Sequence, residues 1–415
     1  MDYSQFLSVV SATREENLIK VTGDLAQKKP SVIMISGGMP NPNYFPFKTA
    51  SFTLQDGTTI EIGEVLMKRA LQYSSTKGIP EFLSWLRDLQ MSLHNPPTAN
   101  YSPDQGLLEI CVTTGSQDSL SKVFEMLVNP GDNVLLEDPS YPGTLSALEP
   151  LGCNIIKVPT DKHGIIPKAL KEILSRWRPE DAKKLNNNLP KFLYTVPNAG
   201  PGNNPAGTSL TADCKKKLYQ LARCYDFLII EDDPYYFLQF EKVNIHLCLF
   251  VFLSHMLFNR PKPLIDRVIL HMQSSTITST FTQVSTIAQL HNYLTRLFLK
   301  TKRLILFCIR IKHIRRNSRK ALICLAEWNI PTAGMFLWIK IKRISNIYQM
   351  ITENALERGV GKDLMMGKYT DSSAPTPFVR ASYSFASPNQ IDQVSVTGVV
   401  VHHWGDLHDQ ILLFM

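Results

Sequence analysis

Two polar side chains that stand three residues apart follow an apolar run in the middle of the chain, and their types suit a site for a charged ring. Asp232 and Tyr235 come just past residues 227–230, Phe-Leu-Ile-Ile. A carboxylate buried there needs a cation or a proton donor beside it, because a lone desolvated charge costs on the order of several kcal/mol. A protonated pyridine nitrogen is one such partner. A capping aspartate with no ligand is the alternative for Asp232.

The elements that would position these groups form a strand–helix–strand unit. Residues 192–196 and 227–230 are continuous apolar or β-branched runs, as in buried parallel strands, and residues 210–225 have helical spacing. Open α/β sheets bind ligands at the carboxyl ends of their strands. A rigid Asn-Pro-Ala-Gly turn at 204–207 presents the Asn204 amide there, since proline fixes one φ and glycine permits a positive φ. An ordinary loop turn is the alternative for Asn204.

A second set of groups lies earlier in the chain, where the sequence favours an anion site. A β-type run ends in Thr114-Gly115 and a helix begins near Ser116. Backbone N–H groups and the positive end of the helix dipole therefore point at one spot, which suits a phosphate. A simple helix cap is the alternative. The chain has neither a G-x-G-x-x-G motif nor a Walker loop, so nucleotides are poor candidates.

Tyr141 lies on a turn framed by prolines, directly after another strand-like run at residues 133–138. In this position its ring can lie across a planar heterocycle. Such stacking contributes roughly 0.5–1.5 kcal/mol beyond burial. The three sites together therefore favour a phosphorylated, cationic aromatic ligand.

The combined pattern, N-P-x-G followed by a strand that ends D-x-P-Y, resembles the fold-type I pyridoxal 5'-phosphate (PLP)-dependent aminotransferases of class I/II. The detail is most similar to the kynurenine/2-aminoadipate branch of that family. The resemblance implies an α/β fold, with a large domain built on a mostly parallel sheet and a smaller α+β domain. It also implies a homodimer that takes amino acid and 2-oxo acid substrates.

The resemblance assigns seven residues to the cofactor. In the family, residues that match Asn204 and Tyr235 bond the 3-oxygen of PLP, and one that matches Asp232 pairs with the pyridinium. Tyr141 matches the ring-stacking tyrosine, and Tyr73, between Leu-Gln and Gly-Ile-Pro flanks, matches a tyrosine that reaches the phosphate held by the neighbouring subunit. The full set is Ser116, Gln117, Tyr141, Asn204, Asp232, Tyr235 and Tyr73, in which Ser116 and Gln117 match residues on the phosphate.

Three further residues are assigned to the substrate by the same resemblance. Gly38 belongs to a G-G-x-P-N-P segment that borders the substrate in the family, and a plain loop is the alternative for this segment. Lys20 stands where arginine is common, which weakens a bidentate grip on a carboxylate. Arg380, inside an alternating strand pattern, matches the arginine that binds the substrate carboxylate, and an internal salt bridge is its alternative. The implied reaction moves the amino group of 2-aminoadipate or kynurenine to 2-oxoglutarate.

The resemblance breaks at residues 241–260 and resumes at Pro261. The family carries an S-x-S-K segment here, whose lysine forms the Schiff base, and neither it nor the following arginine is present. Lys242 and Lys262 are the nearby lysines, and neither fits, so no catalytic lysine is assigned. We expect impaired turnover, because general acid–base catalysis alone supplies about 10²–10⁴-fold. The alternatives are an inactive relative, a truncated isoform or a gene-model product that acts only by binding or dimerisation.

The length of 415 residues favours two domains. We expect residues 1–50 to form an N-terminal arm of the small domain, 51–290 the large domain and 291–415 the rest of the small domain. Seven cysteines without a C-x-x-C pair argue against a zinc site or a disulfide scaffold.

The chain has a net charge of +8, and its positive charge is concentrated in residues 296–320, where many Lys and Arg residues occur. That segment matches no nucleic-acid-binding module, so we expect no nucleic-acid partner. The longest apolar run, 243–258, is too short and too often interrupted to span a bilayer. The polar N-terminus argues against a secretory signal. The resemblance implies the mitochondrial matrix, although the early acids Asp2, Glu15 and Glu16 leave the cytoplasm as the alternative.

Overall fold

The structure of the chain is a computed structural model, and it describes part of the sequence. The described residues are 4–15, 40–54, 56–73, 77–102, 107–161, 163–183, 188–198, 209–236, 269–272, 326–328, 336–342, 345–347, 364–366, 375–382, 399–402 and 410–413. Three predicted site residues, Asn204, Lys20 and Gly38, lie outside these ranges. The segments 241–260 and 296–320 lie outside them as well.

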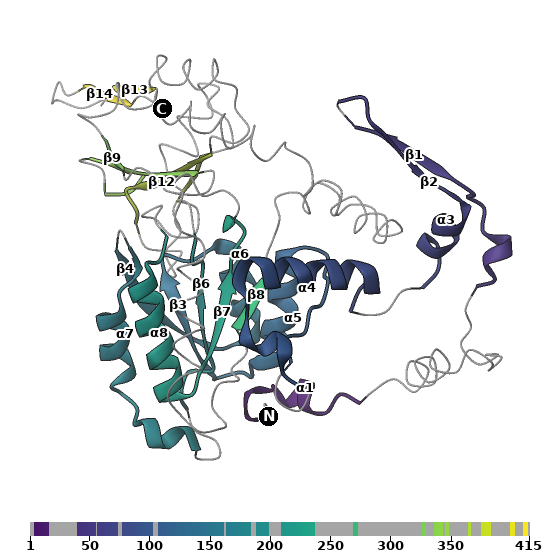
Figure 1. Ribbon diagram of the computed structural model, residues 1–415. Helices are drawn as coiled ribbons and strands as arrows, with labels where there is room; N and C mark the ends of the chain where they lie inside the picture. The colour runs from purple at the N-terminus through teal and green to yellow at the C-terminus, as the bar shows by residue number, and fades with distance from the viewer. Residues whose placement is uncertain are drawn as a thin grey trace.

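The body of the chain is a six-stranded sheet of order β5-β4-β3-β6-β7-β8 (Figure 1). Its central strands pair in parallel, and β5 runs antiparallel beside β4. This confirms the predicted mostly parallel sheet. The strands are β3 (Asn133–Asp138), β4 (Asn154–Asp161), β5 (Gly164–Ile165), β6 (Phe192–Thr195), β7 (Leu228–Asp232) and β8 (Ile269–Met272).

Helices cover both faces of this sheet (Figure 1). Alternate strand residues face opposite ways: Phe192 and Tyr194 join one buried cluster with α5 and α6, whereas Leu193 joins another with α7 and α8. Each layer therefore receives one apolar face of the sheet. The four helices are α5 (Ser116–Leu127), α6 (Pro142–Leu148), α7 (Pro167–Leu174) and α8 (Ala212–Tyr225), and short 3-10 turns η5 (Glu149–Leu151) and η6 (Pro179–Lys183) lie between them.

The predicted strand–helix–strand unit is confirmed as β6, α8 and β7. Helix α8 begins after Thr211, whose hydroxyl accepts a hydrogen bond from the N–H of Cys214 at 3.2 Å, as a helix N-cap does. The second strand extends two residues further than its apolar run, so Asp232 is its last residue. The run before Ser116 differs from its prediction: residues 110–113 form no strand, and Val112 N–H bonds instead to Lys77 O at 2.8 Å.

The first part of the chain contributes an antiparallel hairpin and two helices. The hairpin and α3 stand apart from the large sheet, whereas α4 lies against the body (Figure 1). Pro80 occupies the first turn of α4, as predicted. The elements are η2 (Pro42–Tyr44), β1 (Ala50–Thr53), β2 (Thr59–Ile62), α3 (Glu64–Ala70), α4 (Pro80–His94) and η3 (Pro97–Asn100).

The described C-terminal residues form a separate four-stranded antiparallel sheet of order β11-β12-β10-β9. Its strands are β9 (Ala326–Trp328), β10 (Phe336–Ile341), β11 (Leu364–Met366) and β12 (Phe378–Ser382), and β13 (Val399–His402) pairs with β14 (Gln410–Leu413) in a two-stranded sheet. Antiparallel strands here agree with the expected smaller domain, and the boundaries at residues 50 and 290 stay a prediction.

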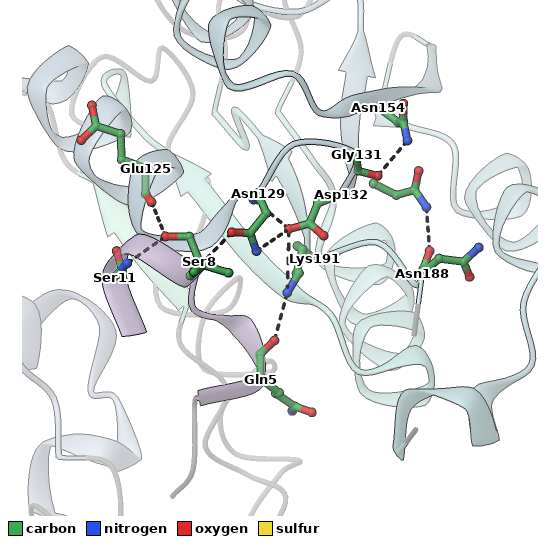
Figure 2. A network of polar contacts seen from close by, with 12 residues as sticks. Gln5, Ser8, Ser11, Glu125, Asn129, Gly131, Asp132, Asn154, Asn188 and Lys191 are labelled. Carbon is green, nitrogen blue, oxygen red and sulfur yellow. Dashed lines mark hydrogen bonds and ion pairs between the residues drawn. The ribbon is translucent and has the colours of Figure 1, made fainter. Parts of the chain in front are cut away.

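The first described residues pack on helix α5, which covers one face of the large sheet. They form η1 (Ser4–Phe6) and α1 (Val9–Ala12), and the Phe6 side chain lies in the buried cluster with Leu120 and Phe124 of α5. Ser8 Oγ donates to Glu125 O at 2.8 Å, and Ser8 N–H donates to Met126 O at 2.8 Å. Figure 2 shows the contact of Ser8 with Glu125 together with those of Asp132 and Lys191, the residues just before β3 and β6.

Candidate active site

A buried carboxylate ends strand β7. Asp232 is 3% exposed, and the hydroxyl of Tyr194 on neighbouring β6 donates to its Oδ2 at 2.9 Å. The two strands pair with Tyr194 opposite Ile230, which brings the phenol onto the same face as Asp232, two residues further along. The predicted placement of Asp232 at the carboxyl edge of the sheet is therefore confirmed.

The phenol beside this carboxylate is held as a proton donor. Burial, followed by the charge of Asp232, raises the pKa of Tyr194 well above 10. The ring is fully buried, and the ring of Phe124 from α5 meets it edge-on at 6.3 Å between centroids. Packing and charge therefore both keep the O–H directed at Asp232.

A second acid, Glu137 near the end of β3, lies at the same edge and is 1% exposed. It accepts hydrogen bonds from Thr195 Oγ1 and from the N–H of Val196, each at 3.1 Å. Burial raises the pKa of Glu137 well above 4.5, the two hydrogen bonds oppose that shift, and the charge of Asp232 adds to it. The environment therefore favours the neutral form of Glu137 beside the carboxylate of Asp232.

The chain just past these strands is held by a further buried pair. Asn198 Nδ2 donates to Asp233 Oδ2 at 2.7 Å. Tyr235, assigned to the cofactor, is buried in the turn after β7, and the neighbouring Tyr236 packs edge-on against His94 of α4 at 5.0 Å between ring centroids. These contacts fix the turn that carries Tyr235.

The predicted helix start is confirmed at Ser116, the first residue of α5. Gly115 precedes it with φ of +95°, a conformation that glycine adopts readily. Asp118 in the first turn accepts from the N–H of Thr114 at 3.0 Å and forms an ion pair with Lys122. The hydrogen bond from Lys122 lowers the pKa of Asp118. The cation thus offsets an acid that would otherwise weaken anion binding at this helix end.

The start of α5 meets the start of α6 through two of the predicted residues. Gln117 Nε2 donates to Gly143 O at 3.0 Å, and Tyr141 is the N-cap residue of α6. A Cβ atom on Gly143 would clash with both the Gln117 amide and the Tyr141 ring. The absence of a side chain at Gly143 therefore lets the Gln117 amide and the Tyr141 ring both approach its backbone.

The sequence of this chain matches known proteins. The family of aminotransferase class I and II matches residues 42–251. The mitochondrial kynurenine/alpha-aminoadipate aminotransferase of Bos taurus is 50% identical over 420 residues, which cover 94% of this chain and 97% of the relative. The chain belongs to the class I and II aminotransferases. The Mus musculus protein of the same name is 48% identical over the same shares of both chains.

Solved aminotransferases share the fold. Aminotransferase Aro8 from Candida albicans superimposes with a TM-score of 0.66 at 24% identity, over 94% of this chain and 95% of that one. The kynurenine aminotransferase of Pyrococcus horikoshii, solved with PMP, gives a TM-score of 0.60 at 22% identity over the same shares. These similarities, together with the family match, confirm the expected fold type I.

For the remaining predicted site residues of this aminotransferase, the structure shows only part of their surroundings or none. Tyr73 is 74% exposed and follows α3, which stands apart from the large sheet (Figure 1). Arg380 lies in β12 with its Cα opposite Trp338 of β10, so its predicted strand is confirmed. The roles of these residues, and of Asn204, Lys20 and Gly38 outside the described ranges, stay predictions.

Sequence reasoning missed several buried polar residues at this edge of the sheet. These are Tyr194, Glu137, Thr195 and the Asn198–Asp233 pair. One signal was available, because each is a polar group inside or directly after an otherwise apolar run. In the described part of the chain, no group of three His, Cys, Asp or Glu side chains could hold a metal ion, and no helix has the length and apolar character of a membrane span.

Proposed function

We propose that this chain binds PLP and catalyses, at an impaired rate, amino transfer from 2-aminoadipate or kynurenine-type amino acids to 2-oxoglutarate. The observation that carries the proposal is the buried Asp232 carboxylate at the end of β7, with the Tyr194 hydroxyl on one of its oxygens at 2.9 Å. A buried anion in this position suits a protonated ring nitrogen. The names of the bovine and mouse relatives support the choice of substrates.

The charge and the chemical types of these residues support the choice of cofactor. Asp232 would pair with the ring nitrogen, and Tyr141 would stack on the ring. The N–H groups and hydroxyl at Ser116, with the Gln117 amide, would hold the phosphate at the start of α5. Asn204 and Tyr235 would bond the 3-oxygen. When bound, PLP supplies an electron sink for the carbanion formed at the amino acid's α-carbon.

The expected impairment follows from the sequence of residues 241–260, which lacks the S-x-S-K segment. A lysine there normally moves the substrate's α-proton, and without it the chain loses its general acid–base group. The missing lysine also supports a second candidate, an inactive PLP-fold protein that acts only by binding or dimerisation. In that case the holding residues remain useful and the reaction does not occur.

The substrate and assembly roles complete the proposal. Arg380 would bind the substrate carboxylate, with Lys20 and Gly38 at the border of the same site. A homodimer would bring the exposed ring of Tyr73 to the cofactor of the neighbouring subunit, which gives that ring a buried environment. The mitochondrial matrix is the proposed location because the bovine and mouse relatives carry "mitochondrial" in their names, with the cytoplasm as the alternative.

The test combines cofactor binding, chemical trapping and turnover on the purified full chain. We expect PLP to bind by absorbance titration and borohydride reduction to label no lysine by peptide mass spectrometry. Amino transfer should run about 10²–10⁴-fold slower than in the bovine relative. Absence of PLP binding would overturn the cofactor assignment. A labelled lysine together with a full rate would overturn the impairment, and a rate of zero with intact binding would favour the second candidate.

A further inference from the structure

Tyr194 donates a hydrogen bond to Asp232 at 2.9 Å, and nothing in the sequence motifs assigns it a role. We propose that Tyr194 is a positioning residue, which keeps the Asp232 carboxylate ionised and oriented for the ring nitrogen of the cofactor. The inference rests on the proposed function, since it concerns the same site. It adds a residue that acts through Asp232 and does not itself touch the ligand.

The geometry restricts both partners. The Tyr194 hydroxyl lies 2.9 Å from Asp232 Oδ2, and the two residues belong to neighbouring parallel strands that pair from Phe192 opposite Leu228 to Thr195 opposite Glu231. A side chain bonded in this way cannot rotate freely about its terminal torsion. The hydrogen bond from β6 therefore restricts the orientation of the Asp232 carboxylate.

Helix α5, whose first residues would hold the phosphate, also packs on Tyr194. Phe124 of α5 stacks on Phe192 at 5.5 Å between centroids and meets Tyr194 edge-on at 6.3 Å. Phe124 lies eight residues after Ser116, which places it roughly 12 Å further along the same helix. Helix α5 thus connects the proposed phosphate-binding residues to Tyr194, the phenol that would orient Asp232 toward the ring nitrogen.

Several titratable groups lie beside Asp232. Glu137 of β3 acts on it electrostatically, Tyr194 of β6 bonds to it, and the neighbouring buried Asp233 accepts a hydrogen bond from Asn198. Burial and the charge of Asp232 keep the Tyr194 phenol protonated, and burial favours neutral Glu137. The hydrogen bond from a neutral donor then stabilises the anion at Asp232, which a second buried charge would oppose.

The test measures the affinity of pyridoxamine 5'-phosphate, a probe that carries the same ring and phosphate and needs no lysine. We expect Tyr194→Phe to raise its Kd about tenfold, the loss expected for one hydrogen bond to a charged group. The acidic limb of the affinity–pH profile should move to higher pH, because the carboxylate has lost its donor. Tyr219→Phe is the matched control, since Tyr219 lies in the core on the opposite face of the sheet.

A double-mutant cycle separates positioning from a general structural role. In an Asp232→Asn background, Tyr194→Phe should change the Kd by less than twofold, because the group through which it acts is gone. An equal effect in both backgrounds, or an unshifted pH profile, would overturn the inference. If the wild-type chain fails to bind the probe, the proposed function itself fails, which is a distinct result.

A second substitution covers the case in which Tyr194→Phe does not fold. Replacing Tyr194 by 3-fluorotyrosine keeps the ring and the hydroxyl and makes the hydroxyl a stronger donor. The acidic limb should then move to lower pH. No movement in a folded protein with this substitution would also overturn the inference.

Discussion

The two ends of the same parallel strands are built in different ways. At the N-terminal ends, Asp132 and Lys191 keep partial contact with water and form an ion pair at 3.9 Å, and Lys191 Nζ donates to Gln5 O at 3.0 Å (Figure 2). At the carboxyl ends, Glu137 and Asp232 are almost fully buried. Solvated pairs cost little to form, whereas buried acids are costly. The first end therefore serves stability, and the second holds costly groups that suit ligand binding.

The largest effect is expected for a substitution of Phe6, the buried apolar side chain of the N-terminal segment, which packs near the N-terminal ends of the strands. Phe6→Ala should lower the free energy of unfolding by about 3–5 kcal/mol, because it empties a buried position beside Leu120 and Phe124. Denaturant titration measures this. The affinity for pyridoxamine 5'-phosphate of the folded fraction should stay within twofold. Val9→Ala, at an exposed position in the same segment, is the control and should change stability by no more than about 0.5 kcal/mol.

A substitution at the carboxyl ends of the strands should instead lower the affinity for the ligand. Asp232→Asn should raise the Kd for pyridoxamine 5'-phosphate on the order of 10²-fold, as expected when one partner of a buried ion pair is lost. Calorimetric titration gives this value. Asp132→Asn at the N-terminal end is the matched control and should leave the Kd unchanged. Equal losses of affinity in the two variants would contradict the division between the ends.

The pH dependence of stability sharpens the comparison further. The folded-state pKa of Glu137 is raised, so the stability from its proton is fully present below about 4.5 and is lost as pH rises through the folded pKa. Glu137→Gln cannot ionise and avoids that loss. Its Tm relative to wild type should therefore increase as pH rises above 4.5. The exposed Glu149→Gln should show no such trend, and a constant difference for Glu137→Gln would contradict the argument.

The smallest expected effect concerns one hydrogen-bonded cap at the stable end. Ser8→Ala removes the bond to Glu125 O and the N-cap bond that Ser11 N–H donates at 3.2 Å. We expect a loss of about 1 kcal/mol in unfolding free energy, as for other helix caps. The same denaturant titration measures it. A loss as large as that of Phe6→Ala would show that polar contacts, rather than apolar burial, hold this segment.

The sequence predicted those features that depend on neighbouring residues. Continuous apolar runs predicted β6 and β7, and a glycine before a polar helical segment predicted that α5 begins at Ser116. The motifs also predicted the fold type and family that the comparisons confirm. Local signals suffice in these cases because strand burial and helix initiation are decided within about one turn or one strand of chain.

Only the tertiary structure decided which polar groups meet. Tyr194 bonds Asp232 across 38 positions, and Ser8 bonds the chain of α5 across 117 positions. The first bond depends on which strands are neighbours and on their register, since a one-residue slip would turn each side chain to the other face. The second depends on how the N-terminal segment packs against α5. The residue types at the site could thus be read from the sequence, whereas their partners and the charge states of Glu137 and Tyr194 required the packed sheet, because burial sets both.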